Sequence, residues 1–179
     1  MDPFFSAIEA NALSVWLRES SSLWVFPFVL ILHTVGLAFV VGANVVLDLR
    51  LLGWARGVPI VSLQRYVWVM WLGFWVNAFS GVLLLIAYPT KALTNPLFYA
   101  KLTLVAVALV AARRIWAALA VAVASGADLE HSATLDHGAA VPPRLRTLAI
   151  VSLAAWTAAI PAGRFLAYTC TRLMVDFAC

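Results

Sequence analysis

Charged residues are scarce in this chain: Asp, Glu, Lys and Arg together make up 11% of its 179 residues. Hydrophobic residues make up 64%, and the mean hydropathy is +0.97. A soluble domain of this length could not hide so much apolar surface in one core. The composition therefore predicts an integral membrane protein whose first partner is the lipid bilayer.

A basic patch that could bind nucleic acid is also missing. The net charge is +4, but the Lys and Arg residues form no cluster with interleaved aromatic residues, so we expect no nucleic-acid partner. Their positions instead predict how the chain is oriented in a membrane.

Cysteine and histidine are equally rare. Cys170 and Cys179 lie near the C-terminus, and no Cys-x-x-Cys pair is present, which disfavours an iron–sulfur cluster and covalently attached haem. The two cysteines are either joined by a disulfide or remain as thiols. Only His33 lies within an apolar stretch, whereas His131 and His137 lie in a polar segment where we expect them to be solvated. No Ser/His/Asp arrangement or carboxylate pair indicates hydrolytic chemistry.

Four apolar stretches are long enough to cross a bilayer, which takes about 20 residues. They lie near residues 23–48, 65–88, 96–121 and 145–169. The sequence thus predicts an all-α fold: one transmembrane domain, residues 1–179, built as a four-helix bundle. The third helix is expected to continue beyond its span.

An amphipathic helix is predicted before the first span. Phe5, Ile8, Leu13 and Trp16 fall roughly on one helical face, which favours a helix lying in the membrane interface.

The distribution of arginine predicts the orientation. Seven arginines flank the first and third connecting loops: Arg50, Arg56, Arg65, Arg113, Arg114, Arg144 and Arg146. Since positively charged loops stay in the cytoplasm, both termini are expected in the periplasm. We therefore expect a multi-pass protein of the bacterial inner (cytoplasmic) membrane.

Each predicted span has one relatively polar or small-residue face, with residues spaced three or four apart. These faces are expected to point inward. They contain His33, Leu37, Val40, Asn44 and Asp48 in the first span; Tyr66, Met70, Gly73, Asn77, Gly81, Leu84 and Tyr88 in the second; Lys101, Val105, Ala108 and Ala112 in the third; and Thr157, Pro161, Arg164 and Tyr168 in the fourth.

Depth brings some of these residues together. At a rise of ~1.5 Å per residue, His33 lies roughly 15 Å and Lys101 about 7 Å from the outer ends of their helices. Arg164 lies close to the outer end of the fourth span. We therefore predict one cofactor-binding site in the outer half of the bundle, formed by His33, Lys101, Arg164, Asn77, Ser80, Tyr88 and Tyr168. Gly36, Gly73 and Gly81 would provide close packing or room for a ligand.

The polar residues have simpler interpretations too. Lys101 and Arg164 could each extend to the interface without binding anything. His33 could be a buried histidine that is hydrogen-bonded to a polar neighbour, namely Asn77, Ser80 or Thr157. Asn44 is expected to serve packing, and Asp48 to pair with Arg50, Arg65 or Arg113.

A neutral imidazole below two cations favours haem b as the ligand, with His33 as the metal-binding residue and the cations on the propionates. The spans contain no second histidine, which excludes bis-histidine ligation within one chain. Quinone is the alternative cofactor. Copper is a poorer third, because Met70 and Met174 lie at different depths from His33.

Three segments resemble a known family: "LHTVGLAFVVGANVVLDLRLLG", "NPLFYAKLTLVAVALVAARRI" and "AGRFLAYT". They are similar to a family of small bacterial inner-membrane proteins of unknown function, whose first span contains LH-x-x-G. A looser similarity extends to copper-resistance CopD-type proteins and other cytochrome b-like bundles. That resemblance implies a haem or copper connection for His33 and Lys101.

The leading hypothesis is a membrane redox subunit that binds haem b, or quinone, and exchanges electrons with a periplasmic redox partner. One alternative is a small transporter or channel for anions or protons, which uses the same polar faces. Another is a structural subunit of a membrane complex that packs through its small residues. In each case we expect a homo-oligomer or a subunit of a larger complex.

Overall fold

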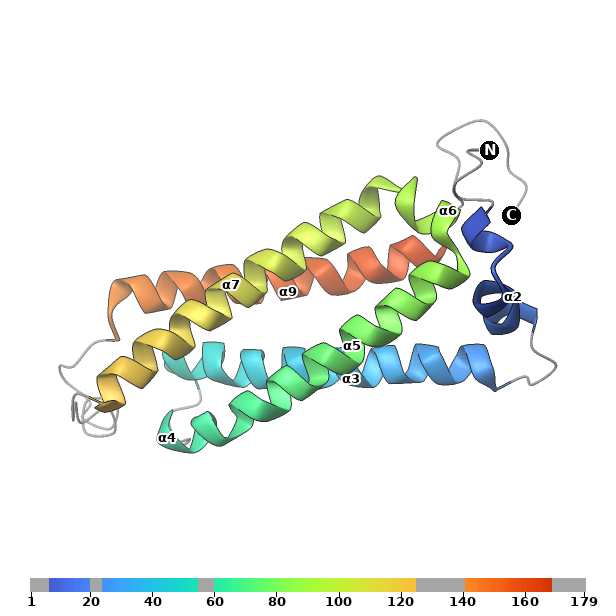
Figure 1. Ribbon diagram of the computed structural model, residues 1–179. Helices are drawn as coiled ribbons and strands as arrows, with labels where there is room; N and C mark the ends of the chain where they lie inside the picture. The colour runs from blue at the N-terminus through green and yellow to red at the C-terminus, as the bar shows by residue number, and fades with distance from the viewer. Residues whose placement is uncertain (1–6, 20–23, 55–59, 125–140, 169–179) are drawn as a thin grey trace.

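The computed structural model describes residues 7–19, 24–54, 60–124 and 141–168, and the regular structure in these ranges is helical throughout (Figure 1). Four long helices dominate: α3 (Val25–Leu51), α5 (Val67–Ala87), α7 (Pro96–Ala124) and α9 (Pro143–Tyr168). The short helices are α2 (Ala12–Glu19), α4 (Ile60–Leu63), the 3-10 turn η1 (Gln64–Tyr66) and α6 (Pro89–Leu93).

Four helical segments are long and apolar enough to cross a membrane: Val25–Leu51, Gln64–Ala87, Pro96–Val121 and Pro143–Leu166. They confirm the four predicted spans, with ends that differ by no more than three residues. The third helix continues to Ala124, as expected. The chain is therefore an all-helical, multi-pass membrane protein.

Local chemistry explains where two of these helices begin and end. At the start of α7, the Asn95 side-chain oxygen accepts a hydrogen bond from the Leu97 N–H at 2.9 Å, which caps the helix ahead of Pro96. At the end of α3, Gly53 takes φ = 89°, and the Trp54 N–H bonds back to the Leu49 carbonyl at 3.0 Å. A left-handed glycine closes a helix in this way without a Cβ clash.

The long helices form two antiparallel pairs, α3 with α5 and α7 with α9 (Figure 1). The pairs meet mainly where α3 packs against α9. We call the two ends of the bundle the α6 end and the α4 end, after the short helices found there (Figure 1).

Among the described residues, the core contains three apolar clusters, of which the smallest joins α2 to the bundle through Leu17, Val29 and Ala87. The cluster nearer the α4 end contains Leu47, Leu51, Leu63, Ile115, Leu119 and Ala149. The second cluster contains Val40, Ala108, Ala155, Trp156 and Ala159. The predicted inward faces of the first and third spans are confirmed, because their residues are buried or half-buried. The face of the second span is confirmed from Met70 to Leu84, whereas Tyr66 and Tyr88 at its two ends are exposed.

The predicted inward face of the fourth span is wrong. Thr157, Pro161 and Arg164 are exposed. The buried face of α9 consists of mostly small residues: Ala149, Ser152, Ala155, Trp156 and Ala159. Small side chains let helices approach closely, which matters most for packing inside a membrane. The size of the side chains, and not their polarity, therefore determines which face of α9 is buried.

The closest approach between two helices occurs where α3 crosses α5. A Cβ built on Gly36 would lie 2.7 Å from the backbone nitrogen of Asn77 and 2.9 Å from the carbonyl oxygen of Gly73. A Cβ on Gly73 would lie 2.7 Å from the Cβ of Phe39. Each of these distances is shorter than a Cβ atom normally keeps from another heavy atom. The crossing therefore requires glycine at both positions.

The N-terminal helix α2 is attached to the α6 end of the bundle by polar contacts. The Arg18 guanidinium donates to the carbonyl oxygens of Glu9 (2.7 Å) and Ala87 (3.3 Å). The Glu9 carboxylate accepts a 2.6 Å hydrogen bond from the Thr90 hydroxyl. Leu17 is the apolar residue of α2 that is buried, while Leu13 and Trp16 are exposed. That this helix lies in the membrane interface stays a prediction.

We predict that Gly36→Ala and Gly73→Ala destabilise the protein, because the added methyl group meets backbone atoms of the other helix. The expected loss is about 1–3 kcal/mol in the free energy of unfolding, measured by denaturation in detergent. Gly42→Ala is the matched control, because a Cβ there meets nothing within 4 Å; we expect no loss, or a gain of up to about 1 kcal/mol. Equal stability of the Gly36 and Gly42 variants would contradict the close crossing.

Candidate functional site

The candidate site is centred on His33, which is held against α5 by its Nδ1 atom. This nitrogen lies 3.0 Å from the backbone oxygen of Asn77 and 3.1 Å from the Ser80 hydroxyl oxygen. In return, the Asn77 side-chain amide donates to the His33 carbonyl oxygen at 2.7 Å. The predicted hydrogen-bonding neighbours Asn77 and Ser80 are therefore correct, and the imidazole has a fixed orientation.

These contacts favour one ring nitrogen of His33 as the one that carries the proton. A backbone oxygen can only accept, and the Ser80 hydroxyl already directs its proton toward the carbonyl oxygens of Val76 (2.7 Å) and Asn77 (3.1 Å). The Asn77 side-chain Nδ2 also lies 3.3 Å from Nδ1, but this amide already donates to the His33 carbonyl oxygen at the shorter distance of 2.7 Å. The 3.0 Å contact with a backbone acceptor therefore favours Nδ1 as the N–H donor, with the lone pair on Nε2. Within the described part of the chain, Nε2 has no hydrogen-bond partner.

Lys101 of α7 lies beside this histidine. Its ammonium group is close enough to His33 for its charge to act on the imidazole. The Lys101 side chain passes over Gly163 of α9, where a built Cβ would lie 3.4 Å from the lysine Cε and 3.5 Å from Nζ. Among the described residues, the ammonium has neither a hydrogen-bond acceptor nor an ion-pair partner.

Two glycines make room for the side chains of the site. A Cβ on Gly81 would lie 3.2 Å from the Cε1 atom of His33, while Gly163 borders Lys101. The expectation that Gly81 creates space is thus correct, although His33 itself uses part of that space. Sequence reasoning missed Gly163, whose signal was its position in the same "AGRF" segment that pointed to Arg164.

The remaining predicted site residues are less closely involved. Arg164 is adjacent to Gly163 in sequence, but its side chain is exposed. Tyr88 is exposed at the α6 end, where its ring meets Phe26 edge to face at a centroid distance of 5.8 Å. The side chain of Tyr168 lies outside the described residues, as do His131, His137, Cys170 and Cys179.

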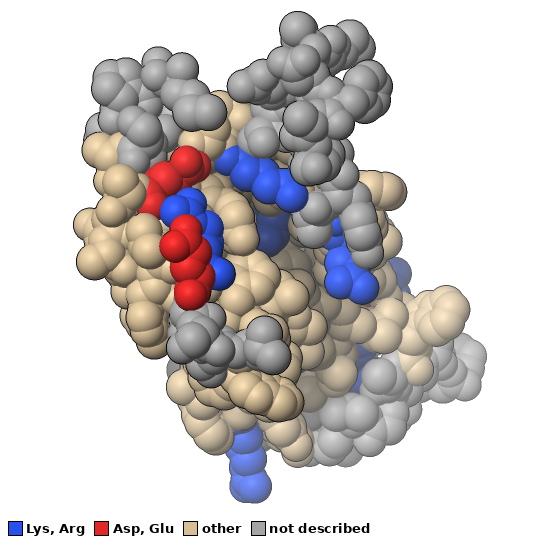
Figure 2. All heavy atoms as spheres, turned by 90° about the vertical axis from the view of Figure 1, so that its right-hand side faces the viewer, with Lys and Arg blue, Asp and Glu red and all other residues tan. Residues whose placement is uncertain are grey.

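Charges at the α6 end are unevenly distributed. Figure 2 looks onto this end and shows acidic side chains gathered on one side, with Lys and Arg side chains around the hollowed centre. Glu9 and Glu19 are the described acidic residues at this end, and Glu9 is already engaged by Thr90. Among the described residues, basic side chains therefore outnumber acidic ones at this end.

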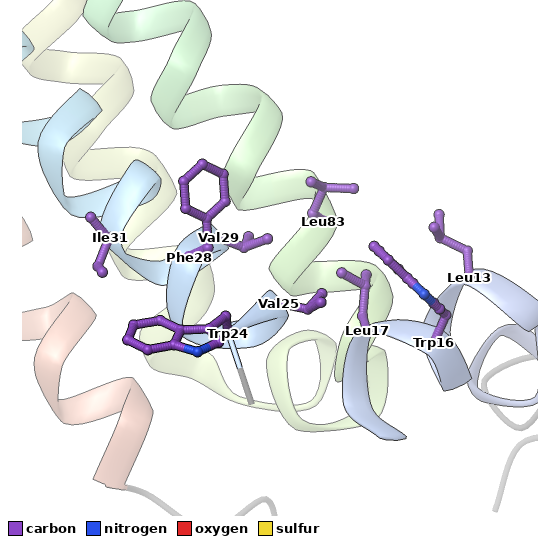
Figure 3. Close-up of a pocket in the computed structure, with 9 residues that line it drawn as sticks. All are labelled: Leu13, Trp16, Leu17, Trp24, Val25, Phe28, Val29, Ile31 and Leu83. Carbon is purple, nitrogen blue, oxygen red and sulfur yellow. The ribbon is translucent and has the colours of Figure 1, made fainter. Parts of the chain in front are cut away.

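An apolar groove of about 510 Å³ lies between α2 and the adjoining ends of α3 and α5. Its lining is aliphatic or aromatic throughout: Leu13, Trp16, Leu17, Trp24, Val25, Phe28, Val29, Ile31 and Leu83 (Figure 3). Two of these residues lie close in sequence to the site, Ile31 near His33 and Leu83 near Ser80. The groove is suited to a hydrocarbon chain.

Comparison with known proteins gave no match: no protein-family model, curated protein or solved structure matches this chain. Function is therefore inferred from the residues of the site alone.

We predict that Asn77→Leu destabilises the α3–α5 pair, because the variant loses the side-chain hydrogen bond to the His33 carbonyl oxygen. The expected loss in the free energy of unfolding is about 1 kcal/mol, typical of a hydrogen bond between membrane helices. Denaturation in detergent measures it. Thr103→Ala is the control, because this exposed hydroxyl bonds only to its own helix. If both variants unfold alike, the Asn77 amide does not join the two helices.

Proposed function

We propose that this protein is a membrane redox subunit that binds haem b through Nε2 of His33. The observation that favours this function most is the fixed imidazole, whose Nδ1–H is directed at the Asn77 carbonyl while Nε2 is left open. Metal-ligating histidines typically donate their second ring nitrogen to a carbonyl or carboxylate, which sets the tautomer and strengthens the ligand.

The donor chemistry of the site fits haem b. Neutral imidazole is an ordinary axial ligand of haem iron, and when bound the cofactor supplies one-electron transfer. His33 would provide a nitrogen ligand to the iron, and Lys101 would provide a cation, without a described partner, for an anionic group of the cofactor. Since His33 is the one span histidine, a second axial ligand would come from another type of side chain or another subunit.

Quinol is the second candidate, and two observations favour it. An Nε2 lone pair accepts a hydrogen bond from a quinol hydroxyl, while Lys101 donates to the oxygen at the other side of the ring. The apolar groove of about 510 Å³ offers a place for a hydrocarbon tail at the same end of the bundle.

The proposed setting is the bacterial inner membrane with the α6 end facing the periplasm, because most arginines of the described loops flank the opposite end. In that orientation the Lys and Arg side chains at the α6 end would face a periplasmic electron carrier (Figure 2). The proposed assembly is a homo-oligomer or a larger membrane complex, which could supply the missing axial ligand.

The test is the absorption spectrum of the full chain purified in detergent from cells supplied with haem precursors. We predict a Soret band that disappears in His33→Ala, because the axial nitrogen is lost. His131→Ala is the matched control, since this histidine lies outside the spans, and its spectrum should be unchanged. Lys101→Gln should retain the band but weaken haem binding about tenfold, as expected for one charged hydrogen bond; Lys91→Gln should not.

A colourless preparation that carries extractable quinone would indicate that the site binds quinol instead of haem. A preparation free of haem, metal and quinone would contradict the redox function, and so would a Soret band that persists in His33→Ala.

A further inference from the structure

A second group of buried polar residues lies far from His33, between the two larger apolar clusters of the core. Asn44 and Asp48 are buried on α3, one helical turn apart, and Ser152 and Trp156 are buried on α9, also one turn apart. Asp48 and Ser152 bring the two helices together, and Trp156 packs in the apolar cluster with Val40. Val40 and Ala155 lie on one side of the layer, in one apolar cluster. We call these four residues the polar layer: Asn44, Asp48, Ser152 and Trp156.

The oxygen atoms of the polar layer lack partners. Asn44, Asp48 and Ser152 are each at most 1% exposed, and Asn44 Oδ1, Asp48 Oδ2 and Ser152 Oγ have no hydrogen-bond partner. The Asn44 amide group is fixed by a 2.7 Å bond from Nδ2 to the Val40 carbonyl, which leaves its oxygen free. The Ser152 hydroxyl is nevertheless close enough to the Asp48 carboxyl group to stabilise its charged form, although their geometry falls short of a regular hydrogen bond.

Among the described residues, Asp48 also has no positive charge beside it, and the Ser152 hydroxyl is the polar group that acts on its carboxyl. The sequence predicts an ion pair with Arg50, Arg65 or Arg113, but Asp48 forms no ion pair with any Lys or Arg of the described residues, and that prediction is wrong. A buried carboxylate inside a membrane is costly unless a positive charge accompanies it. A neutral water molecule could satisfy hydrogen bonds here but would not balance the charge.

The neighbouring helix α7 has only small side chains at this level. α7 contributes Ala111 and Ala112, both buried, between Ala108 of one apolar cluster and Ile115 of the other. Their methyl groups provide no competing ligand or charge.

We propose that the polar layer binds a small monovalent cation, with Na⁺ as its chemical type. A carboxylate, an amide oxygen and a hydroxyl are hard oxygen ligands, which suit hard cations. One carboxylate balances one positive charge, which favours a monovalent ion over Ca²⁺ or Mg²⁺. Asp48 supplies the charge, and Asn44 and Ser152 supply two further oxygens from the two helices. The Trp156 indole N–H, also without a partner, donates to a water on that ion.

The test uses the full chain in detergent at constant ionic strength and pH, with choline chloride replaced stepwise by NaCl. The expected result is a saturable rise in the thermal unfolding midpoint of about 2–4 °C once Na⁺ exceeds its dissociation constant about fivefold. Asp48→Asn, which keeps the shape but removes the charge, should lose this rise. Thr147→Ala, an exposed hydroxyl on α9, should retain it.

Two further measurements keep the proposal falsifiable if Asp48→Asn does not fold. Ser152→Ala should shift the Na⁺ titration to at least several-fold higher concentration, and ²³Na NMR of the unmodified protein should show saturable binding. A midpoint equal in NaCl and choline chloride overturns the proposal, and the layer then holds water only. A midpoint that responds to pH but not to Na⁺ also overturns it, in favour of a protonated Asp48. An unchanged Na⁺ response in Asp48→Asn or Ser152→Ala overturns the assigned ligands.

Discussion

The direct contact between the backbones of α3 and α5 is the constraint on which the candidate site depends. Because Gly36 and Gly73 lack side chains, the backbone of α3 reaches the backbone nitrogen of Asn77. His33 lies one turn before Gly36, and it therefore meets the Asn77 carbonyl and the Ser80 hydroxyl without an intervening side chain. The two glycines thus allow the close crossing that fixes the orientation of the His33 imidazole.

The hydrogen-bond requirements of the membrane interior explain the rest of the arrangement around His33. Where water is absent, polar groups must find partners within the protein. Asn77 satisfies the His33 carbonyl, and Ser80 satisfies two carbonyl oxygens of its own helix while accepting from the histidine. After these bonds are made, His33 Nε2 and the Lys101 ammonium remain as the groups without described partners. They are consequently the atoms that are free to meet a ligand.

Much of the fold could be predicted from the sequence, because hydropathy and helical period dominate in a membrane protein. The four spans, most of the inward faces of the first three and the His33–Asn77–Ser80 contact followed from these patterns. The buried face of the fourth span was not predicted correctly. The prediction relied on the polar residues Thr157 and Arg164, whereas the residues that pack inward are alanines and Ser152. A polarity pattern also could not show that Asp48 lacks an arginine partner, since that depends on how two helices rotate against each other.

The two groups of polar residues differ in what they leave open. At the α6 end, the open atoms are a neutral nitrogen and a cation, His33 and Lys101. In the polar layer, the open atoms are oxygens around a carboxylate, those of Asn44, Asp48 and Ser152. The first set suits an electron-poor metal centre with anionic substituents, while the second suits a cation. One bundle thereby presents two chemically distinct interiors, separated by the apolar cluster around Val40 and Ala108.

The central claim is that His33 presents an unprotonated Nε2 because Nδ1–H is committed to α5. The most direct measurement is the ¹⁵N NMR spectrum of the imidazole in histidine-labelled protein freed of bound cofactor, with the signals of His33 identified by their absence in His33→Ala. The account predicts a protonated Nδ1 and an unprotonated Nε2 for this residue. A proton on Nε2 and a bare Nδ1 would contradict it.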